Sequence, residues 1–447
     1  MERFRSAVRA HYDLALSLVL CAVWNASYLA RRGGGIADWT KELFYFAHAQ
    51  AALRAGHFPG PFAPLPAALA AVNYPAMRST TSYWANPEVF TLSPFLPLLR
   101  VMSLPAFIKL LLVAHSAIGC LGVIMLGRRL GLHPVFRLTL VALTALNPWV
   151  MQHYAIGYTP HVNLLLCPWI AYLLLDPARR VGSAVGAAAI AALMLYQGGL
   201  HVFVWTMLSA GLVTAAIILV QRWEARRAVA FNLGFVAATA LLAAPKLYAT
   251  LHAYRSFRRD VPHGLLVIDD LIGVLADPSP IEPFVDRYST CFWDGSIYMG
   301  WWFIVVAALG LASAFHRVRA SWGSPSTLVV RQLVVLGAVA VAWLSCGWGT
   351  NWADLAAVIR PLDSEIYPYR FIFLALLFVI AVVVIELNAL FLETGRPRRW
   401  LLALALVPVA VFGQAHYALH SRAATSVDAG PMIRGYEQHF ATVARPR

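Results

Sequence analysis

The chain has 447 residues, of which 60% are hydrophobic and 13% are charged, and its mean hydropathy is +0.66. This composition lies well outside the range of soluble globular proteins and excludes that class. Many apolar runs reach the ~20 residues that a helix needs to cross ~30 Å of hydrocarbon, and the short alternating segments of a membrane β-barrel are absent. The sequence therefore predicts an all-α, polytopic transmembrane bundle that forms one integral membrane domain over residues 1–447.

The apolar runs predict about eleven membrane spans. They lie near residues 13–30, 104–127, 134–153, 162–176, 182–197, 200–220, 229–250, 300–316, 333–348, 370–391 and 400–418. The first run lacks a small-residue cleavage site, so we interpret it as a retained anchor.

Arginine predicts the orientation of these spans. Several arginines lie in residues 1–12, and arginine pairs mark alternate loops. These pairs are Arg128–Arg129, Arg179–Arg180, Arg226–Arg227, Arg317–Arg319 and Arg398–Arg399. The positive-inside rule makes the N-terminus cytoplasmic, and an odd number of spans places the tail at 419–447 outside. Most of the net charge of +14 is this topology signal, so it needs no nucleic-acid partner.

Three hydrophilic segments are longer than a connection requires, and all three fall on the predicted extracytoplasmic side. They cover residues 31–103, 251–299 and 349–369. Within the first, apolar and polar residues alternate at helical spacing over 38–56, with Leu43 and Phe46 opposite residues such as Glu42 and Gln50. This pattern predicts an amphipathic helix that lies in the membrane interface. A working site should therefore face away from the cytoplasm.

Asp38 stands just after the first predicted span, at the start of the longest hydrophilic loop. A carboxylate there suits a general base that accepts a proton from an acceptor hydroxyl. The alternative is structural, because aspartate is also a good N-cap for the helix predicted to follow. Capping does not exclude catalysis.

A set of cations lies on the side where the positive-inside rule predicts few of them. These residues are Lys246, Arg255, Arg258, Arg259 and Arg370. Arginine and lysine at such positions would suit the phosphate of a lipid substrate. The alternative is that each side chain snorkels from a helix end toward lipid headgroups.

Other polar residues add candidates for substrate binding. Glu88 lies in the first loop, Tyr369 precedes Arg370, and three histidines stand at the extracytoplasmic ends of spans, where they could line one cavity. The histidines are His153, His161 and His201. The adjacent acids Asp269 and Asp270 could bind a divalent cation, although such pairs are more often solvated turns. We predict no metal site and no cofactor.

The order of these features resembles the GT-C superfamily of polytopic glycosyltransferases, including bacterial members of the YfhO type. The likeness covers most of the chain, in short stretches. These are Asp38-Trp39, Asn86-Pro87-Glu88 with Ser93-Pro94, Gly157 to His161 with Pro168-Trp169, Gln197 to His201, Ala244 to Leu247, Tyr298 to Gly300, and Tyr369-Arg370-Phe371.

The resemblance implies a polyprenyl-phosphate-linked sugar as donor, an extracytoplasmic acceptor, inverting displacement, and Asp38 as the catalytic carboxylate. It also implies a bacterial inner membrane location with the site on the periplasmic side. Two departures stand out: the early loop has one acid where many relatives have a pair, and the chain lacks a soluble C-terminal domain for the acceptor. Metal dependence and acceptor identity therefore stay open.

Two other functions fit the predicted topology. A transporter or lipid flippase would explain the spans, histidines and arginines without catalysis, but such proteins often place charges inside the membrane. The predicted spans show no charge at their centres, and the hydrophilic segments lie on one side. A non-catalytic subunit of a membrane assembly is the second alternative.

Overall fold

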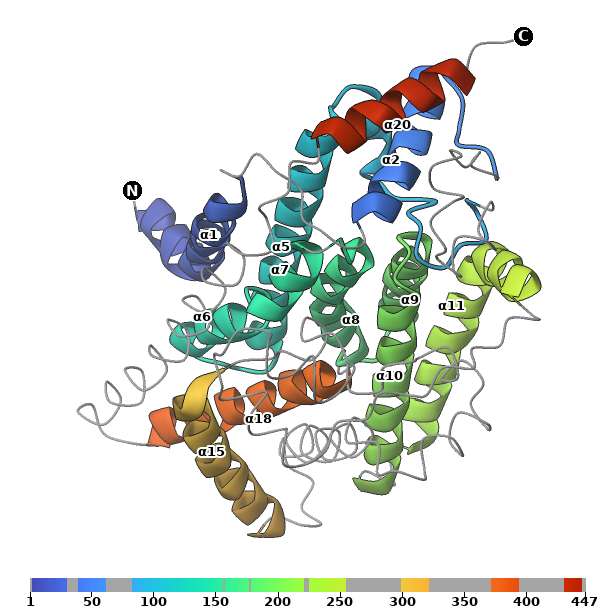
Figure 1. Ribbon diagram of the computed structural model, residues 1–447. Coiled ribbons are helices and arrows are strands. Elements are labelled where there is room, and N and C mark those ends of the chain that lie inside the picture. The colour runs from blue at the N-terminus through green and yellow to red at the C-terminus, as the bar shows by residue number, and fades with distance from the viewer. Residues whose placement is uncertain are drawn as a thin grey trace, which may run out of the picture.

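A computed structural model gives the structure of the protein (Figure 1). It describes residues 2–29, 39–61, 83–155, 157–176, 178–220, 225–254, 299–320, 371–393 and 430–443. These residues are mostly helical and form no strand, and one isolated backbone bridge pairs Phe90 with Gln197. The predicted all-α class is thereby confirmed for the part of the chain that the structure describes.

Helices occupy most of the predicted spans. Seven spans correspond to single helices: α1 (Glu2–Leu29), α5 (Leu104–Arg129), α9 (Val181–Tyr196), α10 (Leu200–Val220), α11 (Ala225–Tyr254), α15 (Gly300–Ala320) and α18 (Phe371–Glu393). The spans predicted at 333–348 and 400–418 lie outside the described residues. By length and composition, two described helices could cross a membrane, Leu104–Arg129 and Arg226–His252.

The third predicted span is broken into α6 (Pro134–Leu143) and α7 (Pro148–Ala155). Proline disfavours helical backbone in the residue before it, so Asn147 and Pro148 together end one helix and begin the next. The Asn147 side chain fixes the break, because its amide donates to Leu143 O at 3.0 Å and its Oδ1 accepts from the Trp149 backbone N–H at 2.9 Å. The sequence alone did not predict this break.

The fourth predicted span combines a 3-10 helix, η2 (Thr159–Leu166), with the short α-helix α8 (Cys167–Leu174). A 3-10 helix rises about 2.0 Å per residue, against about 1.5 Å for an α-helix, so the two segments together extend roughly 28 Å. The two segments together are thus nearly as long as a hydrocarbon layer is thick.

Helix α5 lies at the centre of the core and contacts α1, α6, η2 and α8. Its contact with α8 requires a small residue, because a Cβ added to Gly122 would come within 2.7 Å of the Trp169 ring. The Trp169 indole in turn donates to Ile118 O at 2.8 Å. One glycine therefore lets a large aromatic side chain pack against the backbone of the central helix.

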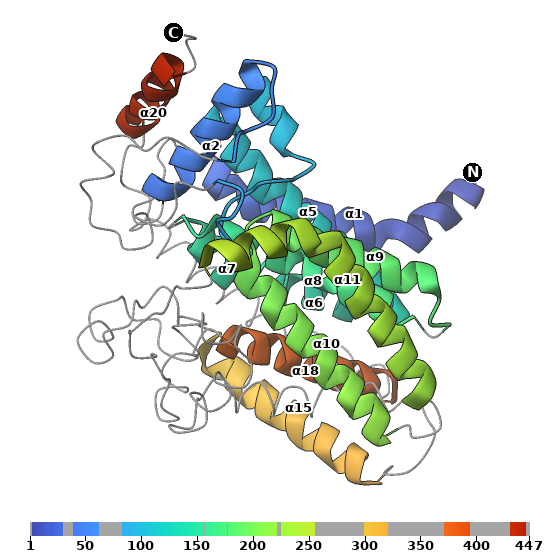
Figure 2. The same cartoon turned by 90° about the vertical axis from the view of Figure 1, so that its right-hand side faces the viewer.

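Helix α2 (Trp39–Arg54), the 3-10 helix η1 (Leu96–Arg100) and the C-terminal helix α20 (Gly430–Val443) gather at one end of the molecule, away from α15 and α18 (Figures 1 and 2). The helix predicted over 38–56 is confirmed. Its expected exposed polar face is wrong, because Glu42 and Gln50 are each 2% exposed. Gln50 donates to Met102 O at 2.8 Å, and α20 covers a further side of α2.

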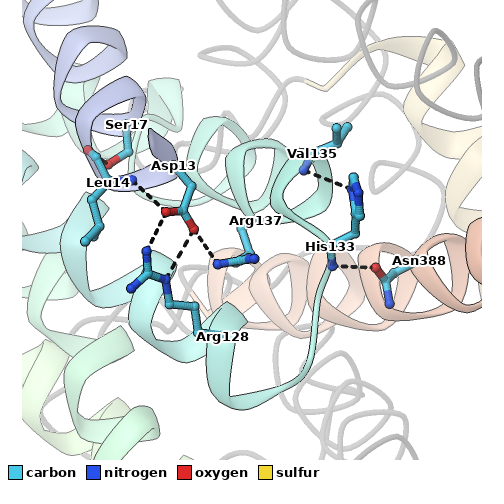
Figure 3. Close-up of polar contacts among 8 residues, drawn as sticks. All are labelled: Asp13, Leu14, Ser17, Arg128, His133, Val135, Arg137 and Asn388. Carbon is cyan, nitrogen blue, oxygen red and sulfur yellow. Dashed lines mark hydrogen bonds and ion pairs between the residues drawn. The ribbon is translucent and has the colours of Figure 1, made fainter. Parts of the chain in front are cut away.

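A different end of the structure carries carboxylates that pair with arginines. Asp13 of α1 is buried and bonds Arg128, whose Nη2 lies 2.5 Å from Oδ1, and also Arg137 (Figure 3). Glu386 of α18, which is 0% exposed, lies 3.1 Å from Arg317 Nε. Glu386 is inside the helix of a predicted span, so the spans are not as free of acids as the sequence suggested.

Candidate functional site

A group of polar side chains lies at the first turn of α2, in the loop 83–92 and at the start of η2. Lys41 Nζ is 2.6 Å from Glu88 Oε2 and 3.8 Å from Glu42 Oε1. Thr159 Oγ1 donates to Glu42 Oε2 at 2.6 Å. We call Lys41, Glu42, Glu88 and Thr159 the carboxylate cluster. It places two acids around one ammonium, with Glu42 almost fully buried and Glu88 one-third exposed.

The backbone of the loop holds Glu88 in place. The Glu88 N–H donates to Asn86 Oδ1 at 3.0 Å, and the Asn86 amide donates to the Tyr45 hydroxyl of α2 at 2.8 Å. Tyr83 closes the loop by donating its hydroxyl to Phe90 O at 2.6 Å. Burial raises the pKa of Tyr83 well above its ordinary value, so this hydroxyl keeps its proton and remains a donor.

The turn after α9 also supports this loop. Gly198 adopts a φ of +76°, and a Cβ there would lie 2.4 Å from Glu88 O. Only glycine meets both conditions, because other residues are strained at positive φ and would collide with the loop. Gly198 therefore allows the backbone of Glu88 to rest directly against the α9–α10 turn.

Lys246 of α11 also binds this loop. Its side chain is 0% exposed, and Nζ donates to Trp84 O at 2.9 Å and to Asn86 O at 2.7 Å. One helical turn later, Thr250 Oγ1 donates to Ala85 O at 2.9 Å. An ammonium has three donors, and no carboxylate among the described residues lies within 4.0 Å of this one. Lys246 is thus a buried amino group whose described partners are neutral carbonyls.

A cluster of aromatic and histidine rings adjoins the carboxylate cluster. Trp149 stacks on His153 with ring centroids 3.7 Å apart, and His161 lies 5.0 Å from His153 and 5.2 Å from Trp149. Tyr158 and Trp205 border the same rings. We call Trp149, His153, Tyr158, His161 and Trp205 the ring cluster. Because Tyr158 directly precedes Thr159, the two clusters are joined along the chain.

The structure brings two of the three predicted histidines into direct contact. His153 and His161 belong to the ring cluster, and His201 joins it through Trp205, with ring centroids 6.5 Å apart. The described residues contain no group of three or more side chains suited to hold a metal ion.

An apolar cavity of about 260 Å³ lies next to the ring cluster. It is lined from α5, α6, α7, η2, α8, α10, α11 and α18. Among its lining residues, Phe373 stacks face to face on Trp149, with centroids 4.3 Å apart and planes at 7°. Phe373 therefore separates the cavity from Trp149, whose other face stacks on His153.

The few polar side chains in the cavity wall bond to their own helices. Each donates to the carbonyl four residues earlier: Thr144 to Leu140 O, Thr206 to Val202 O, Ser209 to Trp205 O and Asn232 to Ala228 O. These donors are already used, so the cavity suits a hydrocarbon better than a polar ligand.

Several predicted site residues lie outside the described residues. They are Asp38, Arg255, Arg258, Arg259, Tyr369 and Arg370. Asp38 directly precedes Trp39, the first residue of α2, and its role as base stays a prediction. Among the described candidates, the structure links Lys246 and Glu88 through Asn86, and it places His161 and His201 at the ring cluster.

Sequence reasoning missed Glu42, Thr159 and Trp149 as site residues. Glu42 carried a signal, because it follows Asp38 by four residues and so shares the spacing of one helical face. Thr159 and Trp149 carried none that separates them from ordinary span-end residues. A comparison with models of known protein families finds no match for this chain, and a comparison with curated proteins finds none either.

Proposed function

We propose that the protein is a polytopic membrane glycosyltransferase that moves a sugar from a polyprenyl-phosphate donor to an extracytoplasmic acceptor by inverting displacement. The observation that carries this proposal is the junction at Trp149. The cavity is lined by Phe373, which stacks on one face of Trp149, and the other polar rings of the ring cluster adjoin its other face through His153. A substrate with a long hydrocarbon chain and a polar, charged head fits such a junction.

The arrangement of the ends supports the proposed membrane topology. Helix α20 packs against α2, so the C-terminal helix and the first long loop share one end of the molecule. The odd span count predicts the same arrangement, with both on the extracytoplasmic side. The carboxylate–arginine pairs of Asp13 and Glu386 involve the arginines that mark predicted cytoplasmic loops.

Inverting sugar transfer needs a base for the acceptor hydroxyl and stabilisation of the departing phosphate. We assign Asp38 as the base, just before α2. Lys246 supports the phosphate assignment, because an anion beside a buried amino group with neutral partners stabilises its protonated form. Arg255, Arg258, Arg259 and Arg370 remain proposed partners of the same phosphate. No metal or cofactor is required by this scheme.

In this scheme the carboxylate cluster binds hydroxyl groups of the sugar or acceptor. Glu88 is one-third exposed and can accept hydrogen bonds from hydroxyls. Lys41 places its amino group beside both carboxylates, 3.8 Å from Glu42 and 2.6 Å from Glu88. The cluster thus offers hydrogen-bond acceptors close in sequence to Asp38.

A transporter or lipid flippase is the second candidate, and Glu386 favours it. Ionisable residues inside a predicted span often mark a transport pathway. Arg317 and Ser313 bind the Glu386 carboxylate, at 3.1 Å and 3.3 Å, so it already forms a structural ion pair. This pairing makes the enzyme the better supported function.

The test is the release of polyprenyl phosphate by the full-length protein in lipid nanodiscs. A panel of polyprenyl-phosphate hexoses is supplied with soluble glycan acceptors. We expect release of the lipid phosphate together with a glycosylated acceptor. Movement of intact donor across a liposome membrane, with no release, would identify a flippase instead.

Asp38→Asn separates catalysis from capping in the same assay. Asparagine caps a helix as well as aspartate does but cannot take up the proton. We expect transfer to fall by ~10²–10⁴-fold while donor binding persists. Near-normal transfer by this variant, with loss only in Asp38→Ala, would leave Asp38 as a cap.

A further inference from the structure

We infer that Trp149 donates its indole N–H to a phosphate oxygen of the lipid donor, where the hydrocarbon chain meets the polar head. The inference rests on the proposed function and adds a residue and a contact to it. Trp149 is 1% exposed, and its Nε1 has no hydrogen-bond partner in the part of the chain that the structure describes. An indole nitrogen is a donor only, so a buried one without an acceptor is rare and costly.

Two half-buried indoles among the described residues have acceptors. Trp169 Nε1 donates to Ile118 O at 2.8 Å, and Trp84 Nε1 donates to Pro59 O at 3.2 Å. The missing acceptor at Trp149 is therefore a property of its position rather than a general feature of the fold.

Loose placement does not explain the missing acceptor, because Trp149 is held at its backbone and on both faces of its ring. Its backbone N–H donates to Asn147 Oδ1, at the break that starts α7. Its ring is sandwiched between Phe373, at 4.3 Å and 7°, and His153, at 3.7 Å and 30°. The structure thus fixes a buried donor at the boundary between two different environments.

The two environments define the ligand that completes this donor. On the Phe373 side lies a cavity whose polar groups are bonded within their own helices, which suits a hydrocarbon chain. On the His153 side lie polar rings. The oxygen that accepts from Trp149 therefore belongs to a group attached directly to an apolar chain. A phosphate fits best, because hydrogen bonds to an anion are shorter and stronger than those between neutral groups.

The test measures binding to the full-length protein in nanodiscs with three probes: geranylgeranyl phosphate, geranylgeraniol and inorganic phosphate. Trp149→Phe keeps a ring between Phe373 and His153 but removes the N–H. Trp169→Phe is the matched control, because it removes an indole donor that serves Ile118 O. We expect Trp149→Phe to bind geranylgeranyl phosphate ~10-fold more weakly than the wild type, because one hydrogen bond to an anion is lost. Its affinity for geranylgeraniol should equal that of the wild type. Trp169→Phe should bind both prenyl probes like the wild type.

Three results would overturn the inference. Trp149→Phe could bind geranylgeranyl phosphate as the wild type does, or it could lose affinity for phosphate and alcohol alike, which would show a packing role only. Inorganic phosphate could displace the prenyl phosphate at equal concentration, which would show an anion site to which the prenyl group adds no affinity. Thermal unfolding without ligand checks the variant, which should be at least as stable as the wild type because it buries no unpaired donor.

Failure of the inference and failure of the proposed function give different results. If the wild type transfers sugar and Trp149→Phe binds prenyl phosphate normally, only the Trp149 contact is wrong. If the wild type releases no polyprenyl phosphate from any donor, the enzyme assignment is wrong whatever the binding data show.

Discussion

Phe440 of the C-terminal helix lies with its ring centroid 5.3 Å from that of Phe44 in α2, although the two residues come from opposite ends of the chain. Tyr436 contacts the same ring at 5.8 Å, and Phe44 is fully buried as a result. Helix α2 carries Lys41 and Glu42 of the carboxylate cluster and directly follows Asp38. The C-terminal helix therefore packs against the element on which the proposed site depends.

Phe440→Ala should loosen α2. Truncating a buried phenylalanine costs ~3–5 kcal/mol, and the loss here falls on the contact between α20 and α2. We expect faster trypsin cleavage after Arg54 and a lower unfolding temperature. Arg434→Ala, on the exposed side of α20, is the control and should behave like the wild type. Unchanged cleavage in Phe440→Ala would show that α2 is held without α20.

Gly198→Ala tests the support of Glu88. The added Cβ meets Glu88 O and the residue must keep a positive φ, so the free energy of unfolding should fall by at least ~1–2 kcal/mol and sugar transfer should drop. Gly182→Ala is matched, since a Cβ there has nothing within 4 Å. Equal stability and activity in the two variants would mean that the loop can move without affecting the site.

The pH dependence of the α2–α20 contact should reflect His48. Burial lowers the pKa of His48, with a smaller contribution from nearby His57. The unfolded chain then binds a proton more readily than the folded protein, so stability is highest above the ordinary pKa of about 6.5 and falls as the pH drops below it. Unfolding temperatures at pH 7.5 and 5.0 check this. His48→Phe should lose less stability on acidification than the wild type, and an equal loss would remove His48 from the explanation.

Lys246→Met tests whether Lys246 binds the donor phosphate or only supports the loop at 83–92. It removes two bonds to loop carbonyls and the buried amino group. Thr250→Val removes a bond from the same helix to the same loop without changing charge. We expect donor binding to fall at least ~10-fold in Lys246→Met, because a hydrogen-bonded cation is worth ~1.5–3 kcal/mol, and to persist in Thr250→Val. Equal weakening in both would assign Lys246 to loop support alone.

Hydropathy predicted the positions of the helices well, because each long apolar run carries its own signal. Helices α5 and α11 match their predicted spans within a few residues. The break at Asn147 and the burial of Glu42 were not predicted. The first depends on Pro148 and on two side-chain hydrogen bonds of Asn147. The second depends on packing that brings Thr159, which is far away in the sequence, against Glu42.

The candidate site was predicted only in part for the same reason. Lys246 was recognised as a cation at a helix end, but its bonds to Trp84 O and Asn86 O depend on how a distant loop packs. The indole N–H of Trp149 lacks an acceptor because of how the surrounding helices pack, and no sequence pattern predicts that. Asp38 was predicted as a site residue from its position after the first predicted span alone.

Asp13 pairs with Arg128, which belongs to a predicted cytoplasmic loop, and with Arg137 of α6, and this gives Arg128 different roles at two times in the life of the protein. Under the proposed topology, loop arginines set the orientation of the spans while the nascent chain enters the membrane. At that stage each arginine still carries an unpaired charge. Only after α1, α5 and α6 have assembled does Asp13 bind both guanidinium groups. Asp13→Asn should therefore insert in the correct orientation and fail later, at helix assembly, so that synthesis and targeting look normal while the mature protein is degraded.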